Sequence, residues 1–546
     1  MEQCSYQAVH HRTTLANEAQ QLVDELAAEA GSLVSPSVYE SARLVSSAPW
    51  LDGHASRVRF LIDRQQDDGT WGGPAGYTLA PTLSAIEALL VEFRRDDDAD
   101  PVCREAIDLG LRSLAASHNS PSAPDEPDMI AWELLVPWLA SEVNDRLEEL
   151  RSQGKHVMPA HAVVARSHMD DQLLNALRDR ARRGIAIGPK FWHSLEFLGD
   201  SAHHASFVLP VNGSVGCSPA ATAAWLGRSP RQSDSSSVSY LVEAQARLGG
   251  PVPGVSPISV FEVAWVLSSF ASASVDVSVS PRMLRQLSQS ITTKGAPAGL
   301  GLPPDSDDTA GALYALSKLG APHSADCLFH YEGDEYFQCF EGERTPSTST
   351  NAHILDILPD RRLFATVSER RRRGAISKVM HWLIDVQGRD GAWQDKWHAS
   401  PYYATMCCTL SLVRLGLSAT STLTRTVRWI LDTQRIDGSW GRWQGTVEET
   451  AYAVRTLITL EIPNRSLAIK SAIAHGAGFL ITHTGLDDHP PLWHDKELYT
   501  PLAVVKAARI SSLYMAISQP DILAAMSNIP LIARAENEPE TGAHST

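Results

Sequence analysis

The sequence predicts an all-α protein, and two observations support this. Apolar residues recur at i, i+3, i+4 and i+7 spacing in many segments, the pattern of an amphipathic helix. The clearest are Ala80–Phe93, Ile258–Ala271, Thr309–Leu319, Met406–Leu415 and Thr450–Leu460. Short groups of Gly, Pro, Asp and Ser separate these segments, and sustained period-2 alternation is rare. We therefore expect helices joined by short turns and few strands.

A repeated motif predicts how the helices are joined. The pattern aromatic-x4-Gln-x2-Asp-Gly-x-Trp occurs three times, with its tryptophan at Trp71, Trp393 and Trp440. We interpret each copy as a helix end, a glycine turn and an aromatic residue. The Gln amide is expected to bond unpaired backbone groups of a neighbouring helix, and the Trp to stack over the junction. The last two copies are one helix pair apart and the first lies far upstream, so it belongs to a separate helical unit.

Length, composition and charge exclude several classes of function. With 546 residues the chain is long enough for two or three domain cores, and 43% of its residues are hydrophobic. A formal charge of −16 argues against a nucleic-acid binder and against strong attraction to anionic membranes. The amino terminus lacks a signal-peptide pattern, no apolar run is long enough for stable membrane insertion, and the seven cysteines are scattered. We expect a cytoplasmic protein.

Three carboxylates, Asp305, Asp307 and Asp308, directly precede the apolar helical segment that starts at Thr309. Crowded carboxylates in an apolar setting cannot all ionise, because burial and like-charge repulsion raise the pKa of at least one. One of them can then keep its proton near neutral pH and deliver it to a weak base such as an alkene. The structural alternative is a helix N-cap cluster, where acids are also favoured.

The DxDD motif together with the Q-x-x-D-G-x-W repeats resembles the class II terpene cyclases. Further segments match in order: Asn212–Pro219, Pro257–Trp265, Ser349-Thr350-Asn351-Ala352-His353 and Asp395–Tyr403. The resemblance implies two α-barrel domains with the substrate cavity between them. A catalytic β domain would comprise residues 1–50 plus 291–546, and an inserted γ domain residues 51–290.

The reaction that the resemblance implies is an isomerisation (an intramolecular lyase reaction) in diterpene biosynthesis. Geranylgeranyl diphosphate would be cyclised by protonation to a bicyclic copalyl or labdane-type diphosphate, with the diphosphate retained. Farnesyl diphosphate giving drimenyl diphosphate, and a halimadienyl or clerodane-type product, stay open as alternatives. A non-enzymatic α-helical repeat scaffold would explain the periodicity but not the clustered acids.

The resemblance also assigns the proton transfers. Asp307 would be the general acid, Asp305 and Asp308 would hold its geometry and protonation, and Asn351 would hydrogen-bond Asp307. His193, in the segment Phe191–Glu196, would take part in the final deprotonation. The family's asparagine partner is replaced here by Gly254, which leaves stereochemistry and product open.

Binding of the diphosphate needs cations. The resemblance places Lys396, with Trp397 and Tyr402 of the same motif, at the substrate, and Arg180 of the basic run Arg178–Arg183 nearby. Plant relatives bind Mg²⁺ through an acidic cluster in the γ domain, and Glu126 and Asp128 lie in the corresponding region.

A second acidic run, Asp96–Asp100, formally satisfies DDxxD, the metal motif of class I terpene synthases. Its hydrophilic surroundings indicate an exposed turn, and no companion metal triad follows. The enzyme is therefore expected to stop at a cyclic diphosphate, which a downstream class I terpene synthase or a phosphatase would process.

Overall fold

A computed structural model of the protein describes residues 2–28, 32–74, 76–95, 101–118, 127–154, 171–343, 345–417, 420–460, 465–486 and 489–526. Helices are the main regular structure of these residues, and their one sheet is a two-stranded hairpin. The all-α prediction is confirmed. Within the described ranges, no helix combines the length and the apolarity needed to cross a membrane.

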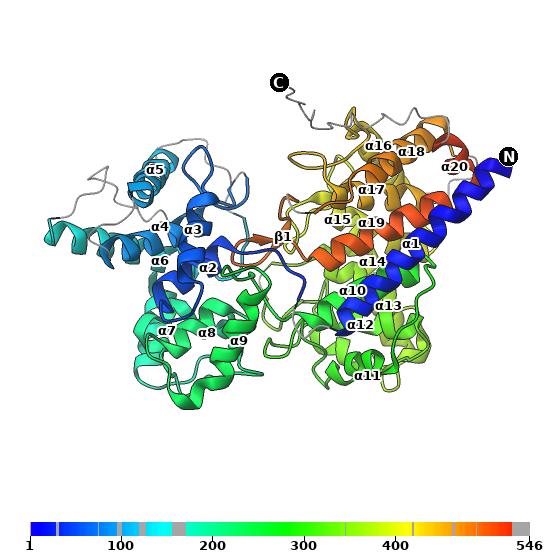
Figure 1. The fold of residues 1–546 in the computed structure, drawn as a ribbon. Coiled ribbons are helices and arrows are strands. Elements are labelled where there is room, and N and C mark those ends of the chain that lie inside the picture. Colours follow the sequence, from blue (N-terminus) through cyan, green and yellow to red (C-terminus); the bar gives the residue numbers. More distant parts are fainter. Residues whose placement is uncertain are drawn as a thin grey trace, which may run out of the picture.

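The helices form two barrel domains side by side (Figure 1). The γ domain holds α2 (Val38–Ser47), α3 (His54–Asp63), α4 (Leu79–Arg95), α5 (Pro101–His118), α6 (Trp132–Ser152), α7 (Asp171–Arg182), η1 (Pro189–Ala202), α8 (Pro219–Leu226), η2 (Gln232–Asp234) and α9 (Ser235–Ala246).

The β domain is the larger one. It holds α1 (Glu2–Ala28), α10 (Ser259–Ser272), α11 (Pro281–Ser290), α12 (Ser306–Lys318), η3 (Asp326–Tyr331), α13 (Thr348–Ile357), η4 (Arg361–Leu363), α14 (Glu369–Asp385), α15 (Pro401–Arg414), α16 (Ser421–Asp432), α17 (Val447–Thr459), α18 (Leu467–Thr482), α19 (Leu502–Ile517) and α20 (Pro520–Met526). The hairpin β1 (Trp493–His494) and β2 (Leu498–Tyr499) lies between the domains (Figure 1).

The domain boundaries differ from the predicted positions 50 and 290. Helix α2, expected in the β domain, packs Tyr39 and Val45 into the core of the γ domain. Helices α10 and α11, expected in the γ domain, pack Phe270 and Leu287 into the core of the β domain. The chain therefore enters the γ domain before α2 and leaves it before α10. Composition does not mark these crossings, because helices of both domains carry similar apolar faces.

The repeated motif has the structural role predicted for it. The amide of Gln65 donates to the carbonyl of Gly69 in its own turn and to Ala106 in α5. Gln434 makes the same pair of bonds, to Gly438 and to Ala472 in α18. The indole nitrogens of all three tryptophans donate to the last turn of the preceding helix, through the carbonyls of Leu61, Leu383 and Ile430. The motif locks the end of one helix to the second helix after it, α3 to α5 and α16 to α18.

Candidate active site

A cavity of about 390 Å³ lies between the two domains. The γ domain contributes its walls at 128–131, Glu133, Lys190 and His193, and the β domain contributes the rest, including all three clustered carboxylates. We call it the interdomain cavity. Its position agrees with the cavity that the sequence resemblance implied.

The acidic cluster is built by the start of α12. Asp305 is the N-cap residue, and its carboxylate accepts a 2.7 Å hydrogen bond from the backbone N–H of Asp308. Asp305 and Asp308 are buried, whereas the side chain of Asp307 is 14% exposed and lines the cavity. The N-cap interpretation is therefore correct for Asp305, while the acid role of Asp307, which faces the cavity, stays a prediction.

Burial makes this cluster retain protons. Burial, together with the neighbouring carboxylate of Asp307, raises the pKa of Asp305 to about 7. Burial first, and then the carboxylate of Asp305, raises the pKa of Asp308 well above its ordinary value. Near neutral pH the three carboxylates therefore hold at least one proton between them.

Asp307 is held by His353 and not by Asn351, which corrects the sequence-based expectation. Nδ1 of His353 lies 2.7 Å from Oδ1 of Asp307. Asn351 instead bonds the backbone N–H and carbonyl of Phe337 and the carbonyl of Ser347. Residues two apart on a helix point to different sides, so on α13 only one of the two can face α12.

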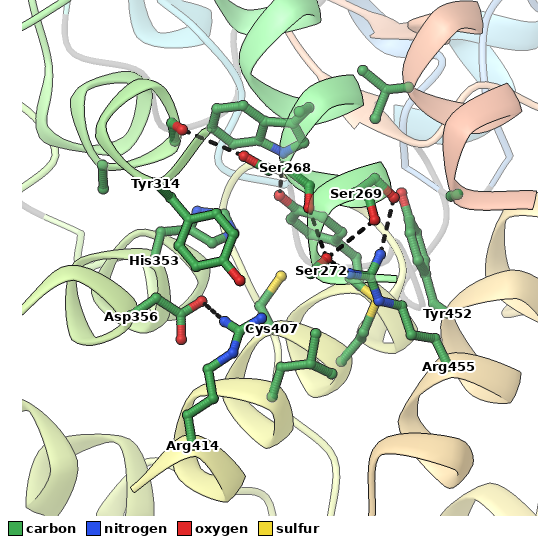
Figure 2. Close-up of a pocket in the computed structure, with 18 residues that line it drawn as sticks. Ser268, Ser269, Ser272, Tyr314, His353, Asp356, Cys407, Arg414, Tyr452 and Arg455 are labelled. Carbon is green, nitrogen blue, oxygen red and sulfur yellow. Dashed lines mark hydrogen bonds and ion pairs between the residues drawn. The ribbon is translucent and has the colours of Figure 1, made fainter. Parts of the chain in front are cut away.

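The ring of His353 joins two cavities. It bonds Asp307 in the interdomain cavity and also lines a smaller cavity inside the β domain (Figure 2). Burial alone would lower the pKa of His353, but the carboxylate of Asp307 outweighs it and raises that pKa well above the ordinary value. His353 is therefore a charged or strongly hydrogen-bonded partner of the Asp307 carboxylate.

Aromatic rings line the apolar part of the interdomain cavity. Phe261 and Trp493 meet edge to face with ring centroids 5.3 Å apart, and Tyr499 lies on the same wall. Aromatic faces attract cations without offering a nucleophile. This wall suits a carbocation that must not meet water.

Charged groups gather at the other end of the cavity. Nζ of Lys396 contacts the carboxylate of Glu343 and lies 4.6 Å from the centre of the Trp397 ring. Lys190, an exposed lysine of η1, lines the same end. Asp395 fixes this loop to the start of α13, because its carboxylate accepts bonds from Ser347 and Ser349. Lys396 and Trp397 thus line the interdomain cavity, and their contact with the substrate stays a prediction.

Two other predicted substrate contacts are wrong. Arg180 is exposed on α7, donates to the carbonyl of Ala186, and does not line the cavity. Tyr402 is buried against Trp429, at a ring distance of 4.6 Å, inside the β domain. Both errors have one cause: sequence gives the order of residues along a helix but not which face meets the cavity.

Only one of the two predicted metal ligands lies among the described residues. Asp128 lines the charged end of the cavity, together with Glu133. Glu126 lies outside the described residues, and so does the DDxxD run Asp96–Asp100. Among the described residues, no three His, Cys, Asp or Glu side chains form a metal-binding group. Mg²⁺ is commonly held by one or two carboxylates plus substrate phosphates, so Asp128 and Glu133 fit a site that the diphosphate would complete.

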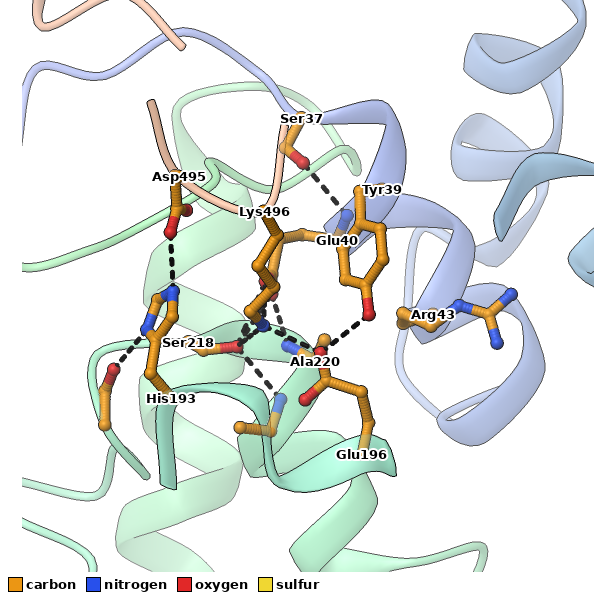
Figure 3. Close-up of polar contacts among 12 residues, drawn as sticks. Ser37, Tyr39, Glu40, Arg43, His193, Glu196, Ser218, Ala220, Asp495 and Lys496 are labelled. Carbon is orange, nitrogen blue, oxygen red and sulfur yellow. Dashed lines mark hydrogen bonds and ion pairs between the residues drawn. The ribbon is translucent and has the colours of Figure 1, made fainter. Parts of the chain in front are cut away.

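His193 lies on the cavity wall, and its partner is Asp495. Its Nε2 is 2.8 Å from Oδ1 of Asp495, and its Nδ1 is 2.7 Å from the carbonyl oxygen of Gly216 (Figure 3). Burial opposes protonation of the ring, but Asp495 outweighs it and raises the pKa of His193 above its ordinary value. Because both ring nitrogens face acceptors, the imidazole and the carboxylate share a proton.

Asp495 also lies beside the glycine at position 254. A Cβ atom added to Gly254 would lie 3.3 Å from Oδ2 of Asp495. The carboxylate therefore lies beside the position of the family's missing asparagine. Sequence reasoning missed Asp495, and its signal was weak: the charged run Asp495-Lys496-Glu497 in an otherwise aromatic segment.

That run is the tip of the hairpin, and it is buried in the γ domain (Figure 3). Nζ of Lys496 lies 2.6 Å from Glu40, 2.8 Å from Glu196 and 2.9 Å from the hydroxyl of Ser218. The hydroxyl of Tyr39 donates to the same Glu196 carboxylate. The ion-pair cluster anchors the hairpin and so sets Asp495 against His193.

Known proteins resemble this chain over nearly its whole length. Residues 345–474 match the family model described as the squalene-hopene cyclase C-terminal domain. The chain is 47% identical over 498 residues to an ent-copalyl diphosphate synthase of Streptomyces sp. (strain KO-3988), covering 91% of this chain and 95% of that protein. It is 36% identical to a labda-7,13-dienyl diphosphate synthase of Streptomyces clavuligerus, covering 88% and 89%.

The fold agrees with these matches. The structure of ent-copalyl diphosphate synthase from Streptomyces platensis superposes with a TM-score of 0.85 at 42% identity, covering 92% of this chain and 99% of that one. An acid cluster facing an aromatic cavity between two helical barrels, together with these relatives, shows that the chain belongs to the bacterial class II diterpene cyclases.

Proposed function

We propose that the protein cyclises geranylgeranyl diphosphate to a copalyl-type bicyclic diphosphate and leaves the diphosphate in place. The contact between Asp307 and His353 at an aromatic cavity carries this proposal. Relatives at 47% and 42% identity are named ent-copalyl diphosphate synthases, which favours the C20 substrate and this product over the farnesyl, halimadienyl and clerodane alternatives.

The first step uses the proton-retaining cluster. Asp307 gives its proton to the terminal C=C of the prenyl chain, and the electron pairs of the next two double bonds close two rings. His353 stabilises the carboxylate that this transfer leaves behind, since its Nδ1 is already 2.7 Å from Oδ1. Phe261, Trp493 and Tyr499 surround the cations without capturing them.

The last step returns a proton to the protein. The pair His193–Asp495 lies on the wall of the same cavity, and Oδ2 of Asp495 lies beside Gly254. We assign the pair as the acceptor of the proton, directly or through one water. One proton enters and one leaves, so the reaction is an isomerisation.

The diphosphate belongs at the charged end. Lys396 and Lys190 are the cations there, against the carboxylates of Asp128, Glu133, Glu341 and Glu343. Acids outnumber lysines, so a diphosphate needs further positive charge. Mg²⁺ held by Asp128 and Glu133 would supply that charge, with Glu126 as a candidate third ligand.

The surroundings of the reaction are part of the proposal. Every cysteine that the structure describes is free, which favours a reducing cytoplasm. The product keeps its diphosphate, so a class I terpene synthase or a phosphatase would act after this enzyme.

The test is an incubation of the purified protein with geranylgeranyl or farnesyl diphosphate and Mg²⁺. The products are dephosphorylated and identified by gas chromatography with mass spectrometry on a chiral phase. Copalol from the C20 substrate is the expected result. Conversion of only the C15 substrate, or release of free diphosphate, would contradict the proposal.

A further inference from the structure

The second cavity lies inside the barrel of the β domain and is not part of the site described so far. Its volume is about 100 Å³, against about 390 Å³ for the interdomain cavity. We call it the barrel cavity. It has room for several water-sized molecules but is far smaller than the space that a prenyl chain requires.

Arg455 of α17 is buried at this cavity, with only 6% of its surface exposed. Its guanidinium donates to two neutral hydroxyls of α10, Ser269 at 3.0 Å and Ser272 (Figure 2). Among the residues that the structure describes, no carboxylate lies within ion-pair distance of it. Arginine does not give up its proton in proteins, so a full positive charge is buried here without a counter-charge.

The other charges of the barrel cavity do not supply that counter-charge. Arg414 is paired with Asp356, which is the one carboxylate that lines the cavity. His353 faces Asp307 on the other side of its ring. Burial, and then repulsion from Arg414, lowers the pKa of Arg455, as expected for a guanidinium whose charge is not balanced.

The remaining walls suit a small anion. Ser268, Tyr314 and Cys407 bring hydroxyl and thiol groups to the cavity. Hydroxyl groups and a guanidinium are donors, so their combination favours an acceptor with negative charge and few geometric demands. We propose that the barrel cavity binds one small inorganic monoanion, such as chloride, against Arg455.

The bound anion lies in the same cavity as His353. It therefore adds negative potential on the side of the ring opposite the catalytic carboxylate. The inference concerns the resting enzyme and does not depend on which prenyl diphosphate is the substrate.

The test compares chloride with gluconate at constant ionic strength. At about ten times the dissociation constant, chloride should raise the Tm of the wild-type protein by about 1–2 °C. Arg455→Met keeps an unbranched side chain and removes the charge, so its Tm should not respond to chloride. Arg389→Met, at an exposed arginine, is the matched control and should respond like the wild type.

A second measurement is independent of how the variants fold. Titration of the wild-type protein with chloride, followed by ³⁵Cl line broadening, should saturate, and bromide in crystals should occupy the barrel cavity. A linear, unsaturated titration, an anion found elsewhere, or an equal Tm response in Arg455→Met would overturn the proposal.

Discussion

Nδ1 of His353 lies 2.7 Å from Oδ1 of Asp307, so the carboxylate that faces the interdomain cavity has a fixed orientation and an ionisable partner behind it. This one contact connects α13 to α12 and defines the acid end of the site. It also separates the role of His353 from that of Asn351, which holds the chain near Phe337.

Replacing the acid should stop the reaction. Asp307→Asn is expected to lower kcat by at least about 10³-fold, and His353→Phe by about 10²-fold with KM nearly unchanged, because both act on proton delivery. Single-turnover assays with geranylgeranyl diphosphate measure the effect, and circular dichroism checks the fold. Normal turnover in His353→Phe would show that the ring does not support the acid.

The pH dependence of stability and of activity should reflect the ionisation of Asp305. Its pKa in the folded protein is about 7, above the ordinary value, so the folded state binds the proton more tightly than the unfolded chain. Its contribution to stability is complete below pH of about 4 and is lost as pH rises through about 7. Activity should fall over the same upper range, because Asp305 then ionises and the cluster holds fewer protons.

Asp305→Asn isolates this contribution, since asparagine also caps helices well. The difference in urea midpoint between pH 5 and pH 8 should be smaller in the variant than in the wild type. Equal differences in the two proteins would mean that Asp305 does not titrate in this range.

The terminal base is tested by Asp495→Asn, which keeps the shape of the side chain and removes its charge. Slower deprotonation prolongs the life of the cation, so we expect kcat to fall by about 10²-fold and hydroxylated diphosphates to appear. Mass spectrometry of the dephosphorylated products measures both. Asp276→Asn, at an exposed position, is the control. An unchanged product profile and rate would exclude Asp495 from the final step.

The hairpin anchor should matter for stability. Lys496→Met leaves the carboxylates of Glu40 and Glu196 buried without their cation, which is expected to cost about 3–5 kcal/mol of unfolding free energy. Urea denaturation measures the loss, with Lys294→Met at an exposed lysine as the control. A loss of unfolding free energy below 1 kcal/mol would show that the ion-pair cluster does not hold the two domains together.

Binding of the diphosphate is tested at Lys396. Lys396→Ala should raise KM about 10- to 100-fold, the effect of one charge-assisted hydrogen bond, with a smaller change in kcat. Arg180→Ala should leave KM unchanged because its side chain is exposed away from the cavity. Steady-state kinetics measure KM for both variants. A raised KM in Arg180→Ala with an unchanged KM in Lys396→Ala would restore the sequence-based assignment of Arg180.

The sequence by itself determined the helical fold, the locking role of the repeats, the acid cluster and the charged loop at Lys396 and Trp397. These features are local: helical periodicity, a turn motif and a run of carboxylates are complete within a few neighbouring residues. Only the tertiary structure decided the pairing of Asp307 with His353 and of His193 with Asp495. It also decided the burial of Arg455, the exposure of Arg180 and the burial of Tyr402 away from the interdomain cavity. These depend on which face of a helix meets which neighbour, and on contacts between residues hundreds of positions apart, which side-chain packing fixes and spacing along the chain does not.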